Sequence, residues 1–290
     1  MAQREGMLRP YIQLMRLDKP IGILLLLWPT LSALWFAAEG LPDMTVLIVF
    51  ILGVIIMRSA GCVINDYADR DFDGQVARTL NRPLALGLIN PKDALILFCI
   101  LGLIAFILVL QLNTLTLWMS LVGLFLAVTY PFMKRYTYLP QVYLGAAFGW
   151  AIPMAFAAQT NAVPVIAWLL FLANILWATA YDTFYAMADR EDDMLAGVKS
   201  TAILFGEDDT LIVGILQLSF LAVMALIGHQ QEMSFIYYLG LLLAAVFFVY
   251  QQKIIITREP AQCLQAFLNN NWVGAVLFCS IVVHYSLVMA

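Results

Sequence analysis

The sequence predicts an all-α integral membrane protein with nine transmembrane helices. Of its 290 residues, 63% are hydrophobic and 12% are charged, whereas soluble domains contain roughly 45–50% apolar and about 25% charged residues. A water-soluble core cannot absorb this excess, so lipid must be the solvent for most of the chain. Two observations give the number of helices: the apolar residues form nine long runs, and the basic residues lie in the N-terminal arm and in or around alternate links between the runs.

Each expected span is close to the roughly 20 predominantly apolar residues that cross a hydrocarbon core. Arg16 and Lys19 precede the first run as in a signal peptide, but the run is long enough to cross a bilayer and many more follow, so we expect it to be retained. Pro29 and Pro153 are tolerated where neighbouring helices satisfy the freed backbone groups. No soluble domain remains, so residues 1–290 form one membrane-embedded domain. The expected spans are residues 20–38, 44–64, 93–112, 114–132, 141–159, 163–186, 209–228, 234–252 and 266–288.

The distribution of Lys and Arg predicts the orientation, because cytoplasmic segments of membrane proteins are enriched in both. Links on the opposite side, such as residues 39–43, contain neither. The N-terminus and the polar links from span two to three and from six to seven are therefore expected on the cytoplasmic side, with the C-terminus on the far side. The basic residues, all on the cytoplasmic side, are Arg4, Arg9, Arg16, Lys19, Arg58, Arg70, Arg78, Arg82, Lys92, Lys134, Arg135, Arg190, Lys199, Lys253 and Arg258.

Charge and cysteine content exclude other classes of protein. The net charge of −4 argues against a nucleic-acid partner. Cys62, Cys99, Cys263 and Cys279 lie in apolar stretches without a C-x-x-C spacing, so no zinc site or disulfide framework is expected.

Two carboxylate pairs with the same spacing end two of the spans. Asp69 and Asp73 lie four residues apart at the end of span two, and Asp189 and Asp193 lie four apart at the end of span six. On a helix this spacing places both side chains on one face, about 5–6 Å apart at Cβ. Equivalent residues of the two pairs are 120 residues and four spans apart. The offset predicts two pseudo-repeated four-helix halves followed by a ninth helix.

Four carboxylates that converge at a membrane boundary need positive charge beside them. A carboxylate near the bilayer centre costs about 2.5–3.5 kcal/mol, and less toward the interface. Mg²⁺ binds one or two carboxylates together with substrate phosphates, so an Mg²⁺–diphosphate complex is the expected occupant, and nearby Arg and Lys side chains would bind the remaining phosphate oxygens. The alternative is a solvated acidic loop with helix-capping roles; two clusters with matched spacing favour the site.

The runs around these residues resemble the UbiA-type intramembrane aromatic prenyltransferases. The two signature motifs of that family are similar to Asn65-Asp66-x-x-Asp69-x-x-x-Asp73 and Asp189-x-x-x-Asp193. Ala85-Leu86-Gly87 departs from the Pro-Ser-Gly expected there, without removing a proposed ligand. The runs that resemble the 4-hydroxybenzoate polyprenyltransferases of bacterial ubiquinone biosynthesis are residues 16–22 (RLDKPIG), 60–66 (AGCVIND), 81–84 (NRPL), 130–136 (YPFMKRY), 181–187 (YDTFYAM) and 197–202 (GVKSTA).

The resemblance implies an activity and a set of residue roles. The family joins a polyprenyl diphosphate to the ring carbon of 4-hydroxybenzoate that is ortho to the phenol, in bacteria at the inner membrane. On this basis we expect Mg²⁺ as the cofactor and no obligate protein partner. The expected Mg²⁺ ligands are Asn65, Asp69, Asp73, Asp189 and Asp193. The expected catalytic residues are Asp69, Asp73, Asp189, Asp193 and Arg135. The expected substrate-binding residues are Arg16, Arg58, Arg70, Tyr130, Lys134, Asp182 and Lys199.

Individual roles within this set follow from chemistry. Arg58, Lys134, Arg135 and Lys199 are candidates to stabilise the departing diphosphate, with Tyr130 as a hydrogen-bond donor. Asp69 is the first choice for the base that takes the phenolic proton. Arg16 or Arg70 would bind the hydroxybenzoate carboxylate.

Aromatic side chains in the same segments have two possible roles. Tyr67, Trp177, Tyr181 and Tyr185 either shield the allylic cation or simply pack. The Asn269–Asn271 run at the start of span nine is expected to be a polar cap, with a role in the site as the alternative. The insoluble polyprenyl tail also favours a lateral opening of the helical bundle.

Two other functions remain possible at this point. A cation-coupled transporter also carries intramembrane acids, but near mid-span, whereas these acids gather at span ends beside basic links. Naphthoate or haem prenylation would use the same aspartate motifs.

Overall fold

A computed structural model describes residues 2–70 and 79–288, and every regular element in these ranges is helical. Nine helical segments within them are long and apolar enough to cross a membrane, as predicted. The long elements are α2 (Ile21–Ala38), α3 (Met44–Asp69), α4 (Pro91–Val109), α5 (Thr114–Thr129), α7 (Pro140–Gly149), α8 (Ala151–Thr160), α9 (Val165–Ala188), α12 (Asp209–Gln230), α13 (Phe235–Ile254) and α14 (Pro260–Val288).

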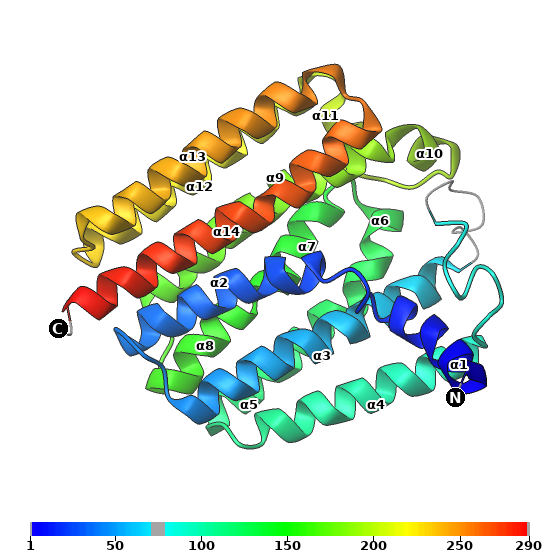
Figure 1. The fold of residues 1–290 in the computed structure, drawn as a ribbon, viewed down its shortest axis with the longest axis horizontal. Coiled ribbons are helices and arrows are strands. Elements are labelled where there is room, and N and C mark those ends of the chain that lie inside the picture. Colours follow the sequence, from blue (N-terminus) through cyan, green and yellow to red (C-terminus); the bar gives the residue numbers. More distant parts are fainter. Residues whose placement is uncertain (1, 71–78, 289–290) are drawn as a thin grey trace.

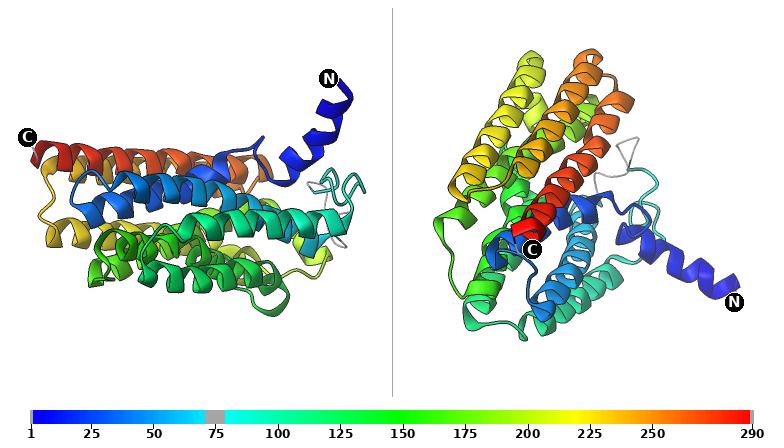
Figure 2. Two further views of the ribbon diagram at one scale, coloured as in Figure 1. Left: turned by 90° about the horizontal axis from the view of Figure 1, so that it is seen from below. Right: turned by 60° about the vertical axis from the view of Figure 1, so that its left-hand side comes forward.

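The remaining elements lie mostly at one end of the bundle, where Figure 1 shows α6 and α10. They are α1 (Ala2–Leu14), η2 (Tyr130–Phe132), α6 (Met133–Tyr136), α10 (Arg190–Leu195), α11 (Thr201–Phe205), η3 (Gly206–Asp208) and η4 (Ile255–Thr257). Figure 2 shows the axes of the long helices roughly aligned with one another, with α1 projecting away from them and the two termini at opposite ends.

The long helices pack side by side in a fixed set of neighbours. Helix α9 packs against α7, α12 and α14, and α2 packs between α14 and α8. Helices α3 and α4 form a second closely packed pair. In Figure 1, α12 and α13 lie along one side of the bundle and α4 and α5 along the other. The central core is built by the inward faces of α2, α8, α9, α12, α13 and α14.

Local capping explains where several spans begin. Asp43 accepts hydrogen bonds from the backbone N–H groups of Thr45 and Val46 and so starts α3. Asn90 starts α4 by accepting from the backbone N–H of Lys92, with Pro91 at the first helical position. Asn113 starts α5 by accepting from the backbone N–H of Thr116. A short polar side chain at this position satisfies a donor that the helix cannot.

Two helix boundaries differ from the expectation. Helix α3 continues to Asp69, so the first acid motif begins inside a helix rather than after it. Helix α14 begins at Pro260, which places the three consecutive asparagines well inside the helix. The prediction of a polar cap at these asparagines is therefore wrong.

Each of the three asparagines binds a different helix. Asn269 Oδ1 accepts from Gln251 of α13 at 2.9 Å. Asn270 Oδ1 accepts from the indole N–H of Trp177 of α9 at 2.8 Å, and Asn271 Oδ1 accepts from Trp28 of α2 at 2.9 Å. Successive helical residues point about 100° apart because a turn holds 3.6 residues, so one short run reaches three neighbours. Helix α14 is thereby tied to α13, α9 and α2.

The buried Trp177–Asn270 hydrogen bond gives a stability prediction. We expect Asn270→Ala to lower the free energy of unfolding by about 1 kcal/mol, because the indole N–H of Trp177 loses its acceptor in an apolar interior. Thermal unfolding in detergent measures this. The same substitution in a Trp177→Phe chain should cost less, since no indole N–H is then left without an acceptor; equal losses in the two backgrounds would contradict the assignment.

Candidate active site

A large cavity of about 1040 Å³ runs between α2, α3, α4, α5, α7 and α8. One end is polar and includes Asn65, Asp66 and Asp182. The other end is apolar. It includes Phe50, near the start of α3, and Leu112, just after the end of α4. The cavity therefore extends along most of the length of the bundle with a polar head and an apolar body.

One side of the cavity has exposed side chains from two helices in its wall. Its lining includes Cys99 and Phe106 of α4 and Leu121 and Leu124 of α5, and all four side chains are exposed. Exposed apolar side chains on a membrane-spanning helix face either lipid or the cavity that they line. A lateral route for a long apolar molecule on this side of the cavity stays a prediction.

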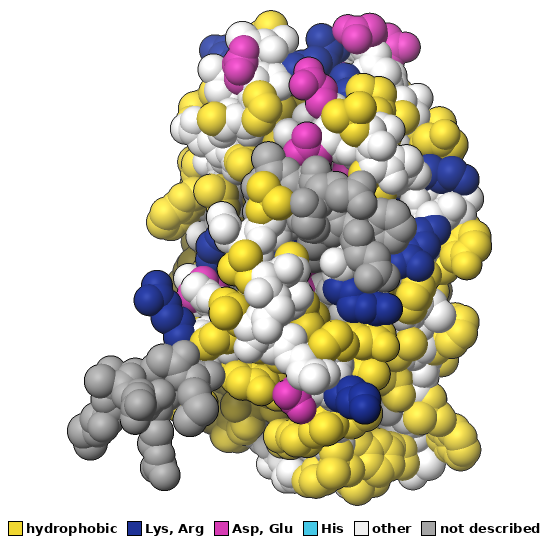
Figure 3. All heavy atoms as spheres, turned by 90° about the vertical axis from the view of Figure 1, so that its right-hand side faces the viewer, with side chains coloured by type: hydrophobic (Ala, Val, Ile, Leu, Met, Phe, Trp, Pro, Cys, Tyr) yellow, Lys and Arg dark blue, Asp and Glu magenta, His cyan; other side chains and the backbone are white. Residues whose placement is uncertain are grey.

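A smaller pocket of about 150 Å³ adjoins the polar end of the large cavity. The two share part of their walls, because both are lined by Asn65, Arg82, Tyr130, Asp182 and Tyr185. Figure 3 looks onto this end of the molecule, where Lys, Arg, Asp and Glu side chains gather. The small pocket is also lined by residues from both acid motifs and by two lysines, namely Asp69, Asp189, Asp193, Lys134 and Lys199.

The two motifs therefore meet in one pocket although they are 120 residues apart in the chain. Asn65 and Asp69 come from the last turns of α3, Asp189 lies between α9 and α10, and Asp193 lies in α10. Asp73, the remaining predicted ligand, lies outside the described residues.

The two carboxylate oxygens of Asp69 differ in their contacts with the described residues. Its Oδ2 accepts from Asn65 Nδ2 at 3.2 Å and pairs with Lys134 Nζ at 2.5 Å. Its Oδ1 is buried and has no hydrogen-bond partner among the described residues. A buried, unpaired carboxylate oxygen is costly to maintain, so a ligand that supplies positive charge or a proton would stabilise it.

The donor set of the small pocket suits a hard divalent cation. Carboxylates and an asparagine amide supply only oxygen ligands on this wall, which are the ligands that Mg²⁺ and similar ions prefer. Within residues 2–70 and 79–288 no group of three Asp, Glu, His or Cys side chains is close enough to hold a metal ion alone. A cation bound here would take further oxygen ligands from its own partner, as Mg²⁺ does from phosphates.

Asp66, next to the predicted ligand Asn65, binds two arginines from other segments. It is 1% exposed and accepts from Arg16 Nη2 at 3.1 Å, and it pairs with Arg82 Nη1 at 3.0 Å. Arg16 precedes α2, and Arg82 follows α3 in the link to α4. Neither Asp66 nor Arg82 was predicted as a site residue. In the sequence they stand out only through their places in the first acid motif and in the NRPL run at residues 81–84.

Arg58 stands on the wall of the large cavity. Its guanidinium lies over the ring of Phe148, with Cζ 5.6 Å from the ring centroid, and donates to the thiol of Cys62. Its Nε is buried and has no hydrogen-bond partner among the described residues. A Cβ on Gly22 would lie 2.5 Å from this Nε. Glycine at position 22 is therefore what leaves room for the guanidinium beside α2.

Three other predicted cations are bound to backbone carbonyls. Arg135 Nη2 donates to the carbonyl of Ala68 at 2.6 Å, and Arg70 Nη1 donates to that of Tyr67 at 2.8 Å. Neither arginine lines either hollow. Lys199 does line the small pocket, but its Nζ donates to the Tyr136 carbonyl at 3.3 Å. Arg70 and Arg135 thus help to fix the end of α3 in this structure, and their roles toward a substrate stay predictions.

The aromatic candidates fall into two groups. Tyr181 and Tyr185 line the large cavity, and the hydroxyl of Tyr181 is buried without a hydrogen-bond partner among the described residues. Trp177 is buried against Tyr181 and Phe220, and Tyr67 lies under Arg70. Only the first group has access to a bound molecule.

The fold and these hollows define a polytopic membrane protein with an acidic pocket beside the polar end of a large, mostly apolar cavity. A profile of the UbiA prenyltransferase family matches residues 26–281. The chain belongs to the UbiA prenyltransferase family.

Close relatives share nearly the whole chain. A protein named 4-hydroxybenzoate octaprenyltransferase from Nitrosococcus oceani is 63% identical over 275 residues, which cover 95% of this chain and 96% of the relative. A protein of the same name from Citrobacter koseri is 59% identical over 281 residues, which cover 97% of each.

Solved structures show the same fold. The apo structure of a UbiA homologue from Aeropyrum pernix K1 has a TM-score of 0.80 at 24% identity, and covers 90% of this chain and 97% of its own. A UbiA homologue from Archaeoglobus fulgidus bound to GPP and Mg²⁺ has a TM-score of 0.72 at 17% identity, and covers 96% and 99%.

The Asp66 ion pairs give a second prediction. We expect Asp66→Asn to lower the free energy of unfolding by about 2 kcal/mol, because Arg16 and Arg82 lose the carboxylate they share in a largely buried site. Denaturation in detergent measures this. Asp18→Asn is the matched control: Asp18 lines the same cavity end but is exposed, so its replacement should cost less than about 0.5 kcal/mol. Equal effects of the two substitutions would contradict the role of Asp66.

Proposed function

We propose that this chain transfers a polyprenyl group from polyprenyl diphosphate to the ring carbon of 4-hydroxybenzoate ortho to the phenol. The products are 3-polyprenyl-4-hydroxybenzoate and diphosphate, in ubiquinone biosynthesis. One observation carries the proposal: both acid motifs line a pocket beside the polar end of a large, mostly apolar cavity. The relatives at about 60% identity, named 4-hydroxybenzoate octaprenyltransferase, support this acceptor.

The diphosphate head group fits the small pocket. Asn65, Asp69, Asp189 and Asp193 would hold Mg²⁺ there, with Asp73 as a further proposed ligand. When bound, Mg²⁺ acts as a Lewis acid that stabilises the negative charge on the departing diphosphate. Lys134 already stands on the same wall, 2.5 Å from Asp69, and its ammonium would share the phosphate oxygens. Tyr130, on the wall that both hollows share, would donate a hydrogen bond to the same group.

The prenyl tail fits the apolar body of the large cavity. Its exposed side between α4 and α5 would let a long tail remain partly in lipid while its head occupies the polar end. The aromatic rings of Tyr181 and Tyr185 line the region beside Asp182, where they would face the allylic carbon as positive charge develops on it.

The acceptor carboxylate needs a cation on the cavity wall, and Arg58 meets this requirement best. It lines the large cavity, its Nε has no partner among the described residues, and a thiol is its only hydrogen-bond acceptor there. Arg16, proposed from sequence, pairs with Asp66, while Arg70 faces Tyr67 and lines neither hollow. A guanidinium that binds a carboxylate with two parallel hydrogen bonds would also orient the ring.

The transfer forms one carbon–carbon bond and breaks the carbon–oxygen bond to diphosphate, and the ring loses one proton. A carboxylate that takes the phenolic proton makes the ring more electron-rich. After the ring carbon has attacked, that carbon loses its proton and the oxygen regains one, so the phenol is restored and one proton is lost in total. Asp69, through its unpaired Oδ1, is the first candidate. If that oxygen instead binds the cation, Asp182 is the carboxylate on the wall shared by both hollows that remains to take the proton.

We also propose that the chain lies in the bacterial inner membrane with its N-terminus and active site on the cytoplasmic side. The Lys and Arg residues lie in the N-terminal arm and in or near alternate links, with Arg58 inside α3, and this distribution supports the orientation. The aromatic acid is soluble and would enter from the cytoplasm, whereas the prenyl donor would enter from lipid.

Turnover by the purified protein tests the proposal. In detergent with a polyprenyl diphosphate, radiolabelled 4-hydroxybenzoate and Mg²⁺, we expect labelled prenylated product, and EDTA should abolish it because the diphosphate then lacks its counter-cation. The absence of product, or equal product with EDTA, would refute the function.

Asp189→Ala tests the second motif separately. We expect a loss of turnover of about a hundredfold or more, because a ligand at the diphosphate is removed, while the protein still inserts and unfolds at a similar temperature. Glu191→Ala, an exposed neighbour that does not line the pocket, is the control and should keep near-normal turnover. Near-normal turnover by the Asp189 variant would exclude its ligand role.

Gly22→Ala tests the acceptor subsite without touching a charged residue. The new methyl group would displace the Arg58 guanidinium, so kcat/KM for 4-hydroxybenzoate should fall by about tenfold or more. The KM for the prenyl diphosphate should stay within about twofold. Gly53→Ala is the matched control, because Gly53 lines the cavity and its added Cβ would meet no atom within 4 Å. Equal losses for the two substrates would contradict the assignment of Arg58.

A further inference from the structure

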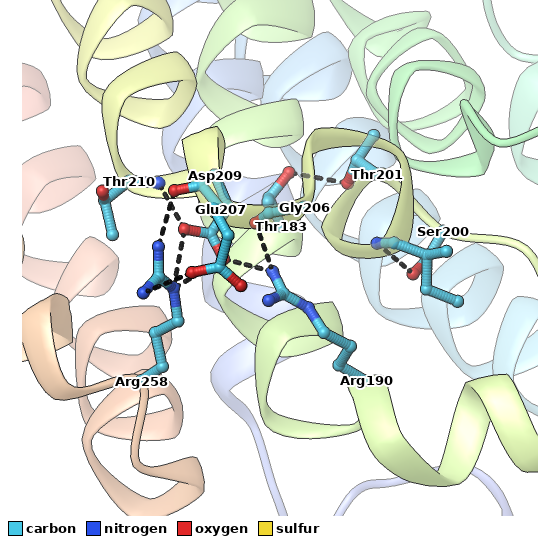
Figure 4. Close-up of polar contacts among 10 residues, drawn as sticks. Thr183, Arg190, Ser200, Thr201, Gly206, Glu207, Asp209, Thr210 and Arg258 are labelled. Atoms are coloured by element: carbon cyan, nitrogen blue, oxygen red, sulfur yellow. Dashed lines mark hydrogen bonds and ion pairs between the residues drawn. The ribbon is translucent and has the colours of Figure 1, made fainter.

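Asp209 is a buried carboxylate outside the pocket that binds two arginines. It is the first residue of α12 and is fully buried. Its Oδ2 pairs with Arg190 Nη2 of α10, and Arg258 Nε donates to Oδ1 at 3.1 Å and to Oδ2 at 3.2 Å. Figure 4 shows the two guanidinium groups approaching Asp209 from opposite sides.

Arg190 belongs to the second acid motif, yet its side chain leaves the pocket. It follows Asp189 directly and precedes Asp193 by three residues. Both aspartates line the small pocket and Arg190 does not. Besides Asp209, its guanidinium donates to the carbonyl of Gly206 at 3.2 Å, at the start of η3 (Figure 4). The motif thus presents carboxylates on one side and its arginine on the other.

Arg190 also has a potential partner much nearer in the sequence, on its own helix. Residues three apart on a helix are neighbours, so Arg190 and Asp193 have the spacing of an ion pair. A guanidinium that turned toward Asp193 would neutralise a carboxylate of the pocket and compete with a bound cation. Asp209 offers a fully buried carboxylate, where an ion pair is screened least by water and salt.

We infer that Asp209 is a positioning residue that holds Arg190 away from the carboxylates of the second motif, so that this guanidinium does not compete with the Mg²⁺–diphosphate complex for them. Arg258 completes the arrangement: it also binds Glu207, at the carbonyl and at Oε2, and so keeps the second side of Asp209 occupied. The inference rests on the proposed function, because it assumes a cation at Asp189 and Asp193.

Binding of Mg²⁺, rather than turnover, tests this inference. The thermal unfolding midpoint of the purified chain would be followed as Mg²⁺ is titrated in the presence of geranyl thiodiphosphate, an unreactive analogue of the donor. We expect Asp209→Asn to raise the half-saturating Mg²⁺ concentration by about fivefold or more, because Arg190 is then released toward Asp193. Arg190→Gln in the same chain should bring that concentration back to within about twofold of the starting protein.

The double variant separates this role from simple support of the fold. If Asp209 only stabilised the fold, Asp209→Asn would lower the unfolding temperature without moving the Mg²⁺ half-saturation, and Arg190→Gln would bring no recovery; either result overturns the inference. Glu207→Gln is the control, since it removes the exposed partner of Arg258 and leaves the Arg190–Asp209 pair intact. It should not shift the Mg²⁺ titration.

Two further outcomes are also decisive. If Asp209→Asn does not fold, Arg190→Gln alone is used: it should leave the Mg²⁺ half-saturation within about twofold, and a several-fold rise would overturn the inference. If the unaltered chain shows no Mg²⁺-dependent stabilisation, the proposed function fails and this inference fails with it. A normal response of the unaltered chain with an unshifted Asp209→Asn variant overturns the inference alone.

Discussion

Carboxylates at the end of membrane-spanning helices must be offset by positive charge, and the arrangement of this site follows from that constraint. Desolvated anions are costly, and a pocket that gathers several of them is stable only with cations beside it. Asp69 is paired with Lys134, which comes from a segment that follows α5. The Oδ1 of the same side chain has no hydrogen-bond partner among the described residues and could accept a ligand.

Each half of the chain has a buried aspartate, in or near its acid motif, that binds two arginines. In the first half Asp66 binds Arg16 and Arg82, and in the second half Asp209 binds Arg190 and Arg258. These four arginines fasten the segments before α2, after α3, after α9 and before α14 around the two motifs. The pocket is therefore held by ion pairs at its rim, while lipid-facing helices supply the apolar cavity behind it.

The spans were predictable from sequence because a run of about 20 apolar residues has few other uses. The meeting of the two motifs followed from their equal spacing and the 120-residue offset, and the structure places Asp69, Asp189 and Asp193 in one pocket. The family resemblance rested on runs that cover nearly the whole chain, and the family match confirms it. Local sequence patterns therefore predicted the fold and the meeting of the two motifs in one pocket.

Contacts between distant segments were not predictable. The bonds from Asn269–Asn271 to three helices and the ion pairs of Asp66 and Asp209 join residues whose separation in sequence follows no local rule. The sequence likewise suggested Arg16 and Arg70 for the acceptor carboxylate, because it does not show that Arg16 pairs with Asp66 or that Arg58 lines the cavity. Helix packing, rather than composition, decides which cation reaches a ligand.

The central claim is that both halves of the chain bind one metal–diphosphate complex. Replacing Mg²⁺ by Mn²⁺ and adding geranyl thiodiphosphate allows a direct test by electron paramagnetic resonance, because a phosphate oxygen on Mn²⁺ produces ³¹P hyperfine coupling. In protein freed of unbound metal and analogue, we predict a ³¹P-coupled Mn²⁺ signal that is lost in Asn65→Ala, from α3, and equally in Asp193→Ala, from α10. A signal that depends on residues of only one half would contradict it.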